Sequence, residues 1–481
     1  MARNIRNKFK NAVLLVPDIA AFYSSLFAAY YLRMMLYLLF STKFLEPFPL
    51  EYFLRFWWFP AIFLSFILYE RLYIRRLPFW DETRELSKAT SAATIAILSI
   101  LSLTKMSENI SRLTIVFLWC FSLFFFPYFR MIGKKIFYKI GLWRDNVIII
   151  GAGSAGKAIA RGISGNIHLG YNVIGFLDDD DRIGRQVDIA GSTYNIFGKI
   201  KHFTKFVNLL DISTVIIAIP SLAVDRLAEL TANIQKHTKN ILLIPDIKGV
   251  SLTNTELHHF FLQQMFLLKI NNNLTSPVNK FIKRALELAI SLVFMPLLLL
   301  IIGIIGLLII LDSPGPIFYR QPRRGRNGRP FTVYKFRSMY QDAMDRLENI
   351  LTTDPRANLE WETYFKLKND PRITRMGAFL RKTSLDELPQ VFNVLSGDMS
   401  LVGPRPVLDE EITKYYREFS DYYHMVRPGI TGLWQVSGRN NLDYAMRVRL
   451  DAWYVLNWSV WLDIMILFQT IRVVLNKEGA Y

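Results

Sequence analysis

Long apolar runs separated by charged segments dominate the N-terminal part of the chain. Four of them cover residues 13–33, 53–70, 87–104 and 113–129. Each is near the ~20 residues that a helix needs to cross ~30 Å of hydrocarbon. The runs 13–33, 53–70 and 113–129 are rich in Phe, Trp or Tyr, which is unusual for the core helices of a soluble protein. The pattern therefore predicts a four-helix transmembrane bundle over residues 1–140.

Shorter apolar runs alternate with helical patterns over residues 141–270. The expected strands cover residues 146–150, 173–177, 214–219 and 240–244. Strands that alternate with helices are typical of βαβ units and a parallel sheet. This segment is therefore predicted to be an α/β Rossmann-like domain.

A glycine-rich turn follows the first of these strands. Gly151, Gly153 and Gly156 form a G-x-G-x-x-G motif, and Asp178 follows the second strand. In a dinucleotide-binding site the glycines approach a pyrophosphate and the acid binds a ribose. The same turn can simply pack a helix onto the sheet, and the segment has no Tyr-x-x-x-Lys pair for nicotinamide chemistry. We favour the packing interpretation and keep nucleotide binding in this domain as a hypothesis.

A fifth apolar run, residues 288–311, has no charged residue in its 24 positions. Seven cations and no acid lie between Ser313 and Gln341. A full crossing would place this tract outside the cell, against the positive-inside rule. Pro296 would also kink a helix here, because proline lacks an amide and clashes with the preceding turn. We predict a re-entrant helix–break–helix over residues 281–311; the alternative is an ordinary kinked spanning helix.

The overall charge is consistent with a membrane protein. The chain has a formal net charge of +18, and 52% of its residues are hydrophobic. The cations cluster beside the apolar runs, where anionic headgroups attract them, so nucleic acid is set aside as a partner. Their distribution places both ends of the bundle in the cytoplasm. A single cysteine, Cys120, excludes an intrachain disulfide and a cysteine-based metal site.

Two adjacent acids, Asp386 and Glu387, stand out in the C-terminal part. Pro389 is tolerated only near a helix start, so a helix is predicted to begin no earlier than about Leu385. Ser384 and Glu387 fit a capping box, and the acids could simply complement the helix dipole. Alternatively, the helix end would bind a phosphate, lower the pKa of the carboxylate and keep it nucleophilic.

The chemistry of a phosphate site suggests roles for the residues around this pair. A carboxylate such as Asp386 can attack phosphorus and form an acyl phosphate. Glu387 could hold Mg²⁺, which uses one or two carboxylates together with waters and substrate oxygens, and Asp398 is a further candidate ligand. Cations bind diphosphate oxygens, often bidentately; the candidates are Lys335, Arg337, Arg381, Arg405 and Arg427.

Long motifs connect these residues. They read YKFRSM, NDPRITRMGAFLRKTSLDELPQVFNVLSGDMSLVGPRP, RPGITGLWQVSGRN and KEGAY. Through them residues 278–481 resemble the polyprenyl-phosphate hexose-1-phosphate transferases, also called monotopic phosphoglycosyl transferases. The four membrane helices and the nucleotide-binding-like domain resemble the large bacterial members of this family. The expected architecture is a multi-domain membrane protein that ends in an α-rich monotopic catalytic domain with a re-entrant helix.

The resemblance implies a mechanism and a cellular setting. Asp386 and Glu387 would form the family's Asp-Glu dyad, with Asp386 taking the sugar-phosphate from a UDP-sugar and releasing UMP. Undecaprenyl phosphate would then attack this intermediate, which starts O-antigen or capsule synthesis. Galactose is the favoured hexose, with glucose as the alternative. Mg²⁺, a homodimer and a catalytic domain on the cytoplasmic face of the bacterial inner membrane are also implied.

The resemblance further implies a membrane helix that is broken at a Ser-Pro pair. The corresponding pair here is Met295-Pro296, so the proline is kept and the serine is absent. Two other functions stay open as lower alternatives. One is a membrane-bound nucleotide-sugar dehydratase or epimerase that uses the middle domain, and the other is a non-catalytic membrane scaffold.

Overall fold

The computed structural model describes residues 12–40, 49–104, 111–180, 184–210, 212–238, 240–245, 255–260, 265–270, 273–354, 358, 367, 370–438 and 442–476. The chain forms two compact units, Met1–Lys248 and Gly249–Tyr481. The N-terminal unit holds the apolar bundle and the α/β domain. The C-terminal unit holds the long apolar helix and the acidic pair; the terminal KEGAY motif lies outside the described residues.

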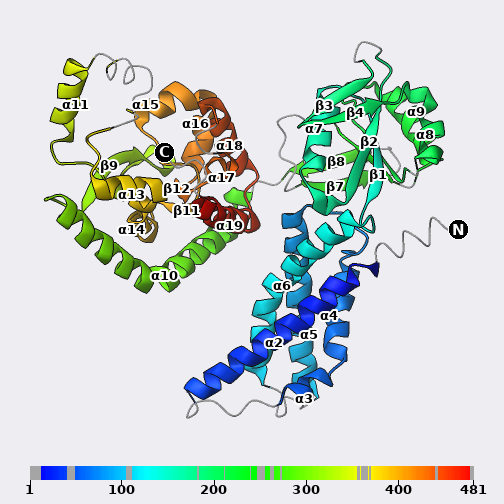
Figure 1. Cartoon of the computed structure of the whole chain (residues 1–481), viewed down its shortest axis with the longest axis horizontal. Coiled ribbons are helices and arrows are strands. Elements are labelled where there is room, and N and C mark those ends of the chain that lie inside the picture. The colour runs from blue at the N-terminus through cyan, green and yellow to red at the C-terminus, as the bar shows by residue number, and fades with distance from the viewer. Residues whose placement is uncertain are drawn as a thin grey trace. The chain divides into compact units, whose positions relative to one another are not determined.

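Four apolar helices near the N-terminus form the bundle (Figure 1). They are α2 (Leu15–Leu39), α4 (Trp58–Tyr69), α5 (Phe79–Leu103) and α6 (Arg112–Lys139), with the short α3 (Leu50–Leu54) before α4. The helices α2, α5 and α6 are long and apolar enough to span a membrane, whereas α4 has 12 residues. The second predicted run is therefore interrupted. Pro60 explains the interruption, because its ring would clash with the carbonyl of Phe56 in a continuous helix.

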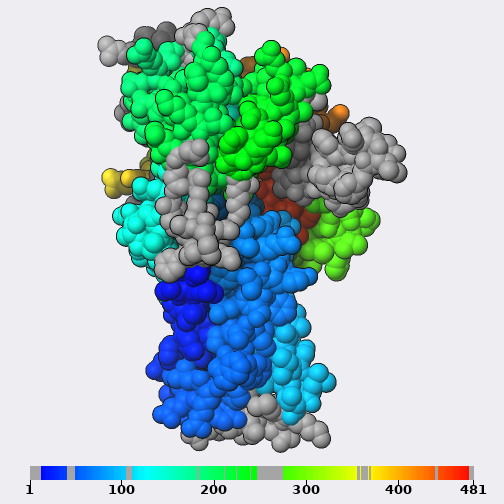
Figure 2. Space-filling view, turned by 90° about the vertical axis from the view of Figure 1, so that its right-hand side faces the viewer, coloured from blue at the N-terminus to red at the C-terminus, as the bar shows by residue number. Residues whose placement is uncertain are grey.

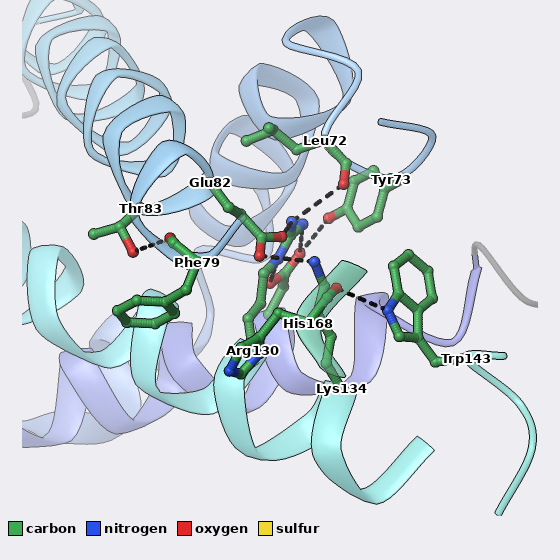
Figure 3. Close-up of polar contacts among 10 residues, drawn as sticks. Leu72, Tyr73, Phe79, Glu82, Thr83, Arg130, Lys134, Trp143 and His168 are labelled. Carbon is green, nitrogen blue, oxygen red and sulfur yellow. Dashed lines mark hydrogen bonds and ion pairs between the residues drawn. The ribbon is translucent and has the colours of Figure 1, made fainter. Parts of the chain in front are cut away.

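The bundle packs around a buried ionic network (Figure 3). The guanidinium of Arg130 lies 2.7 Å from Asp18 and 2.8 Å from Glu82. Lys134 lies 2.7 Å from Glu82, and the Tyr73 hydroxyl donates to Asp18. All five side chains are buried. Buried charges are costly unless they are paired, and each charge of this network has an opposite partner.

The surface of the bundle is apolar. Figure 2 shows its helices, in blue, as one column of closely packed side chains. Many large hydrophobic side chains on this surface are exposed, among them Val16, Tyr31, Leu38, Ile95 and Phe124. Exposed apolar surface of this extent is typical of a protein in contact with lipid. The bundle thus buries the five side chains of the ionic network and exposes many of its hydrophobic side chains.

The α/β domain is built on a six-stranded sheet of order β3-β4-β2-β1-β5-β6. Its strands are β1 (Asp145–Ile150), β2 (Tyr171–Leu177), β3 (Gln186–Ile189), β4 (Ser192–Ile196), β5 (Thr214–Ile217) and β6 (Asn240–Leu243). The four predicted strands are β2, β1, β5 and β6, and they pair in parallel as expected. The hairpin β3–β4 was not predicted.

Helices cover both faces of this sheet (Figure 1). They are α7 (Ser154–Ser164), α8 (Phe203–Leu209) and α9 (Val224–Gln235). Val147 and Ile149 of β1 pack on the α7 side, whereas Ile148 and Ile150 pack on the side of α8 and α9. Successive side chains of a strand point to opposite faces, so this apolar strand serves two cores.

The glycine motif has a clear packing role. Gly151 has a φ of 101°, and a Cβ on Gly156 would collide with the Gly151 carbonyl oxygen. Gly153 precedes α7 and faces open space. The carboxylate of Asp178 accepts a hydrogen bond from the Ala152 amide at 2.7 Å, so it braces the loop itself. These contacts account for the motif by packing, and nucleotide binding stays a hypothesis.

A buried junction joins the bundle to the α/β domain. Arg76, which follows α4, lies 2.6 Å from Asp145 of β1 and donates to the Leu169 carbonyl. The ring of Trp143 is contacted by Arg76 at 4.4 Å and by Lys134 at 4.9 Å. Trp143 is buried. The contacts therefore cross the predicted boundary between residues 140 and 141.

The C-terminal unit is rich in helices. The α-helices are α10 (Pro277–Asp312), α11 (Ala343–Thr353), α13 (Arg375–Thr383), α14 (Gln390–Ser396), the single-turn α15 (Asp409–Glu411), α16 (Ser420–Met425), α17 (Leu433–Ser437), α18 (Tyr444–Leu456) and α19 (Val460–Asn476). The strands pair in twos: β7 (Thr255–Phe260) with β8 (Met265–Ile270), β9 (Phe318–Arg324) with β10 (Pro330–Phe336), and β11 (Ser400–Val402) with β12 (Gly429–Thr431).

Helix α10 corrects one expectation. It is a continuous helix of 36 residues that includes Pro296, so the predicted interruption at Met295-Pro296 is wrong. A proline removes one amide donor, which bends a helix without necessarily ending it. Figure 1 shows α10 bent near its middle, with both ends directed toward the rest of the unit. The re-entrant path itself stays a prediction.

Candidate active site

The acidic pair lies on a single 3₁₀ turn between α13 and α14. This turn, η7, covers Leu385–Glu387, so the predicted start of helical structure no earlier than Leu385 is confirmed. Ser384 has a φ of 57° and makes no side-chain capping hydrogen bond. The predicted capping box is therefore wrong, because Ser384 serves as the left-handed residue that ends α13. Asp386 and Glu387 are partly buried.

Three cations from three separate elements surround the pair. Lys335 of β10 donates to Glu387 Oε1 at 2.8 Å. Arg405, in the turn after β11, lies 3.5 Å from the same oxygen. Arg381, near the end of α13, acts electrostatically on Asp386. The structure therefore brings together five of the residues that the sequence singled out, in an arrangement that suits a diphosphate.

The electrostatics of the nucleophile candidate differ from the expectation. Burial and the neighbouring Glu387 raise the pKa of Asp386, and the nearby Lys335, Arg381 and Arg405 only oppose this effect. The predicted lowering of this pKa is therefore wrong. A three-residue turn supplies little helix dipole, whereas loss of water and a like charge both disfavour the ionised form. Perturbed carboxylates of this kind cluster at functional sites.

A buried asparagine fixes the position of Lys335 relative to the pair. Asn393 of α14 donates to the Thr332 carbonyl at 2.7 Å and accepts from the Tyr334 amide at 3.1 Å. It thereby fixes α14 against β10, and Lys335 is the next residue on that strand. Sequence reasoning missed Asn393, although a polar residue in the apolar stretch VFNVL was an available signal. Buried amides of this kind are normally fully hydrogen-bonded.

Glycines allow the close packing that holds the arginines. A Cβ on Gly377 would collide with the Ser338 carbonyl, so α13 could not approach this segment as closely with any other residue. Arg381, one turn later, donates to Ser338 Oγ at 2.9 Å. A Cβ on Gly403 would likewise press on the backbone that precedes β12. This contact fixes the turn that carries Arg405.

Arg337 does not take the predicted role. Its guanidinium donates to the carbonyls of Pro314 at 2.7 Å and Ser313 at 2.5 Å. The side chain is 7% exposed. Both terminal nitrogens are used by the chain that leaves α10, so the geometry argues against phosphate binding by Arg337. Its role is to fix the end of the long apolar helix.

Asp398 and Arg427 lie apart from the acidic pair. The acidic pair precedes the N-terminal end of α14, whereas Asp398 follows its C-terminal end. The carboxylate of Asp398 accepts a hydrogen bond from the Ser396 hydroxyl at 2.7 Å. Arg427 is half-buried and interacts electrostatically with Arg284 and Asp398. The prediction that Asp398 and Glu387 share a metal is therefore not supported. Within the residues that the structure describes, no group of three His, Cys, Asp or Glu could hold a metal ion.

Comparisons with known proteins match two parts of the chain to described families. Residues 278–477 match the family described as bacterial sugar transferase, and residues 74–245 match the family described as CoA-binding domain. The undecaprenyl-phosphate galactose phosphotransferase of Salmonella typhimurium is 39% identical over 85% of this chain and 84% of its own length. The UDP-galactose-lipid carrier transferase of Erwinia amylovora is 40% identical over 85% of this chain and 84% of its own length.

A third relative carries a different sugar in its name. The UDP-glucose:undecaprenyl-phosphate glucose-1-phosphate transferase of Escherichia coli is 32% identical over 73% of this chain and 72% of its own length. Identity at these levels over most of both chains establishes the family. This chain belongs to the bacterial sugar transferases that include the undecaprenyl-phosphate sugar phosphotransferases, and it is an enzyme of the transferase class.

Proposed function

We propose that this enzyme transfers hexose-1-phosphate, with galactose as the favoured hexose, from a UDP-sugar to undecaprenyl phosphate. The observation that carries this proposal is the partly buried acidic pair among Lys335, Arg381 and Arg405. The names of the relatives from Salmonella typhimurium and Erwinia amylovora support galactose. The name of the relative from Escherichia coli makes glucose the alternative.

The transfer proceeds in two displacements at one phosphorus atom. A carboxylate oxygen of Asp386 bonds to the phosphorus that carries the sugar, and the bond from that phosphorus to the bridging oxygen breaks. UMP leaves, and the sugar-phosphate stays on Asp386 as an acyl phosphate. An oxygen of undecaprenyl phosphate then attacks the same phosphorus and releases the carboxylate. Lys335 and Arg405 balance the negative charge of the diphosphate.

The proposal includes Mg²⁺ held by Glu387. The charge of Glu387 contributes to the raised pKa of Asp386, so the two carboxylates form a concentrated negative site with oxygen donors that suit this ion. When bound, the ion would neutralise charge on the transferring phosphoryl group. Lys335, 2.8 Å from Glu387, keeps that carboxylate in place beside the nucleophile.

We further propose that the enzyme is a homodimer in the bacterial inner membrane, where it starts O-antigen or capsule synthesis. The catalytic unit would lie on the cytoplasmic face, with α10 entering and leaving the membrane on that side. The bend of α10 and the cationic tract after it support this path. A tag-accessibility assay on intact cells tests the path, and finding Tyr481 outside would contradict it.

The function is tested with purified protein, undecaprenyl phosphate, Mg²⁺ and a panel of UDP-sugars. We expect UMP release to be fastest with UDP-galactose. With the donor alone, the mass of the peptide that contains Asp386 should increase by one hexose phosphate. Asp386→Asn should abolish both signals, whereas Asp345→Asn, at an exposed position on α11, should keep them. UMP release at the wild-type rate by Asp386→Asn would overturn the nucleophile assignment.

A further inference from the structure

Two adjacent cations near the start of α10 reach two different parts of the active site. Arg284 donates to the carbonyls of Val394 at 2.6 Å and Leu395 at 3.0 Å. These are among the last carbonyls of α14, which have no partner within the helix, and a cation there is favourable. The other end of α14 follows directly on the turn that carries Asp386. Arg284 therefore connects α10 to the helix behind the nucleophile.

Lys283, the preceding residue, connects α10 to the other side of the site. Its ammonium group donates to the Val402 carbonyl at 3.0 Å and lies 2.6 Å from Asp463 of α19 and 3.1 Å from Glu287. Val402 is the last residue of β11. The rigid turn that follows carries Arg405 to the acidic pair.

The surroundings of Lys283 are buried and fully connected. Asp463 accepts from the Tyr454 hydroxyl at 2.7 Å and from the Trp458 ring nitrogen at 3.0 Å, and Glu287 accepts from the Ser400 hydroxyl. All of these side chains are buried. Networks of this kind hold a single arrangement, because a broken bond would leave an unpaired polar group without water. A lysine that only flanked a membrane segment would need none of these partners.

We propose that Lys283 and Arg284 are positioning residues of the transfer reaction. Lys283 acts through β11 and sets the place where Arg405 meets the donor diphosphate. Arg284 acts through α14 and sets the place of Asp386. Helix α10 thus contacts both the helix that follows Asp386 and the strand that precedes Arg405. Its position in the membrane therefore fixes the distance between these two residues. This inference rests on the proposed function.

Steady-state and single-turnover kinetics of two variants distinguish these two roles. Lys283→Met should raise the KM for the UDP-sugar roughly tenfold, the scale of one charged hydrogen bond, with little change in kcat. Arg284→Met should instead slow formation of the covalent adduct roughly tenfold and leave that KM unchanged. Arg284→Lys, which can keep one of the two carbonyl bonds, should recover part of the rate.

Lys280→Met is the matched control, because it removes the same charge from an exposed position on the same helix. It should change neither the KM for the UDP-sugar nor the rate of adduct formation. A Lys283→Met variant with the wild-type KM, or an Arg284→Met variant with the wild-type rate of adduct formation, would overturn the proposal.

A double-mutant cycle tests whether Lys283 acts through Arg405. The variant Lys283→Met/Arg405→Met should have a KM no higher than that of Arg405→Met alone. Independent effects would multiply, to roughly a hundredfold, and would contradict the proposal. If Lys283→Met folds poorly, Lys283→Met/Asp463→Asn removes one charge of each sign and should show the same raised KM. Absence of UMP release and of the adduct in the wild type would instead contradict the proposed function.

Discussion

Lys335 Nζ lies 2.8 Å from Glu387 Oε1, although 52 residues separate the two in the sequence. The two side chains are 19% and 20% exposed, so the pair is shielded from much of the solvent. A partly buried ion pair is screened less than a surface pair and has a defined geometry. The site is therefore a product of packing between β10 and the turn before α14.

Lys335→Met should lower the rate of UMP release about 10- to 100-fold, because the variant loses a charged hydrogen bond beside the transferring phosphate. The rate is measured with saturating UDP-galactose and undecaprenyl phosphate. Lys382→Met removes the same charge from an exposed position on α13 and should stay near the wild type. Equal rates in the two variants would show that Lys335 has no part in the reaction.

Arg337→Met should affect stability and leave substrate binding unchanged. It removes two hydrogen bonds to the carbonyls of Ser313 and Pro314, for a loss of roughly 3 kcal/mol. Thermal unfolding in detergent should show this loss, while the KM for the UDP-sugar in the folded fraction stays the same. Arg329→Met, at an exposed position, is the control for the change of charge. If Arg337→Met instead raised the KM for the UDP-sugar and kept the wild-type stability, Arg337 would bind the substrate phosphate after all.

The stability of the C-terminal unit should decrease as the pH rises toward neutral. Burial raises the pKa of Asp451 from 3.8 to about 7, so the folded state binds a proton that the unfolded state has lost. The protonated carboxyl group contributes its full stabilisation of the folded state below pH 4. This stabilisation is lost as the pH rises to about 7, and the total loss is at most ~4 kcal/mol.

Asp451→Asn should remove this pH dependence, because the amide keeps the shape of the side chain without the titrating proton. Melting temperatures at several pH values between 4 and 8 measure the effect. Asp421→Asn, at an exposed position on α16, should keep the wild-type slope. A wild-type melting temperature that is constant over this range would contradict the prediction.

Arg130→Met should destabilise the bundle by roughly 3–5 kcal/mol, because it leaves Asp18 buried without a cation. Glu82 would still have Lys134. Resistance to thermal aggregation in detergent, followed by size-exclusion chromatography, measures the change. Arg112→Met removes an exposed arginine from the start of the same helix and should have little effect. A bundle that tolerates both changes equally would argue against a structural role for the network.

The elements that the sequence predicted well are those whose signal is local. The spans α2, α5 and α6 contain long apolar runs, which contact with lipid requires. The strand β1 carries four apolar residues in a row, which burial on both faces of the sheet requires. The hairpin β3–β4 has mixed polarity and exists only because it pairs at the edge of the sheet. Its sequence alone therefore carried little signal.

The candidate site shows the same limit. The motif identified Asp386 and Glu387, but the raised pKa of Asp386 depends on elements that pack around it. Arg337 and Lys335 are two residues apart on or beside the same strand, yet one binds the end of α10 and the other binds Glu387. Residue type and spacing cannot separate these outcomes, because only the tertiary structure decides which partner each cation meets.

The junction at Trp143 has a practical consequence for anyone who dissects this chain. A soluble fragment that begins at residue 141 would keep the indole and Asp145 and lose Arg76, which neutralises the acid and covers the ring. The excised piece would carry an uncovered indole beside its first strand and a carboxylate that has lost its ion pair with Arg76. A piece that begins upstream of residue 74, where the match to the second family begins, keeps Arg76 on the ring but also keeps the apolar helices α5 and α6.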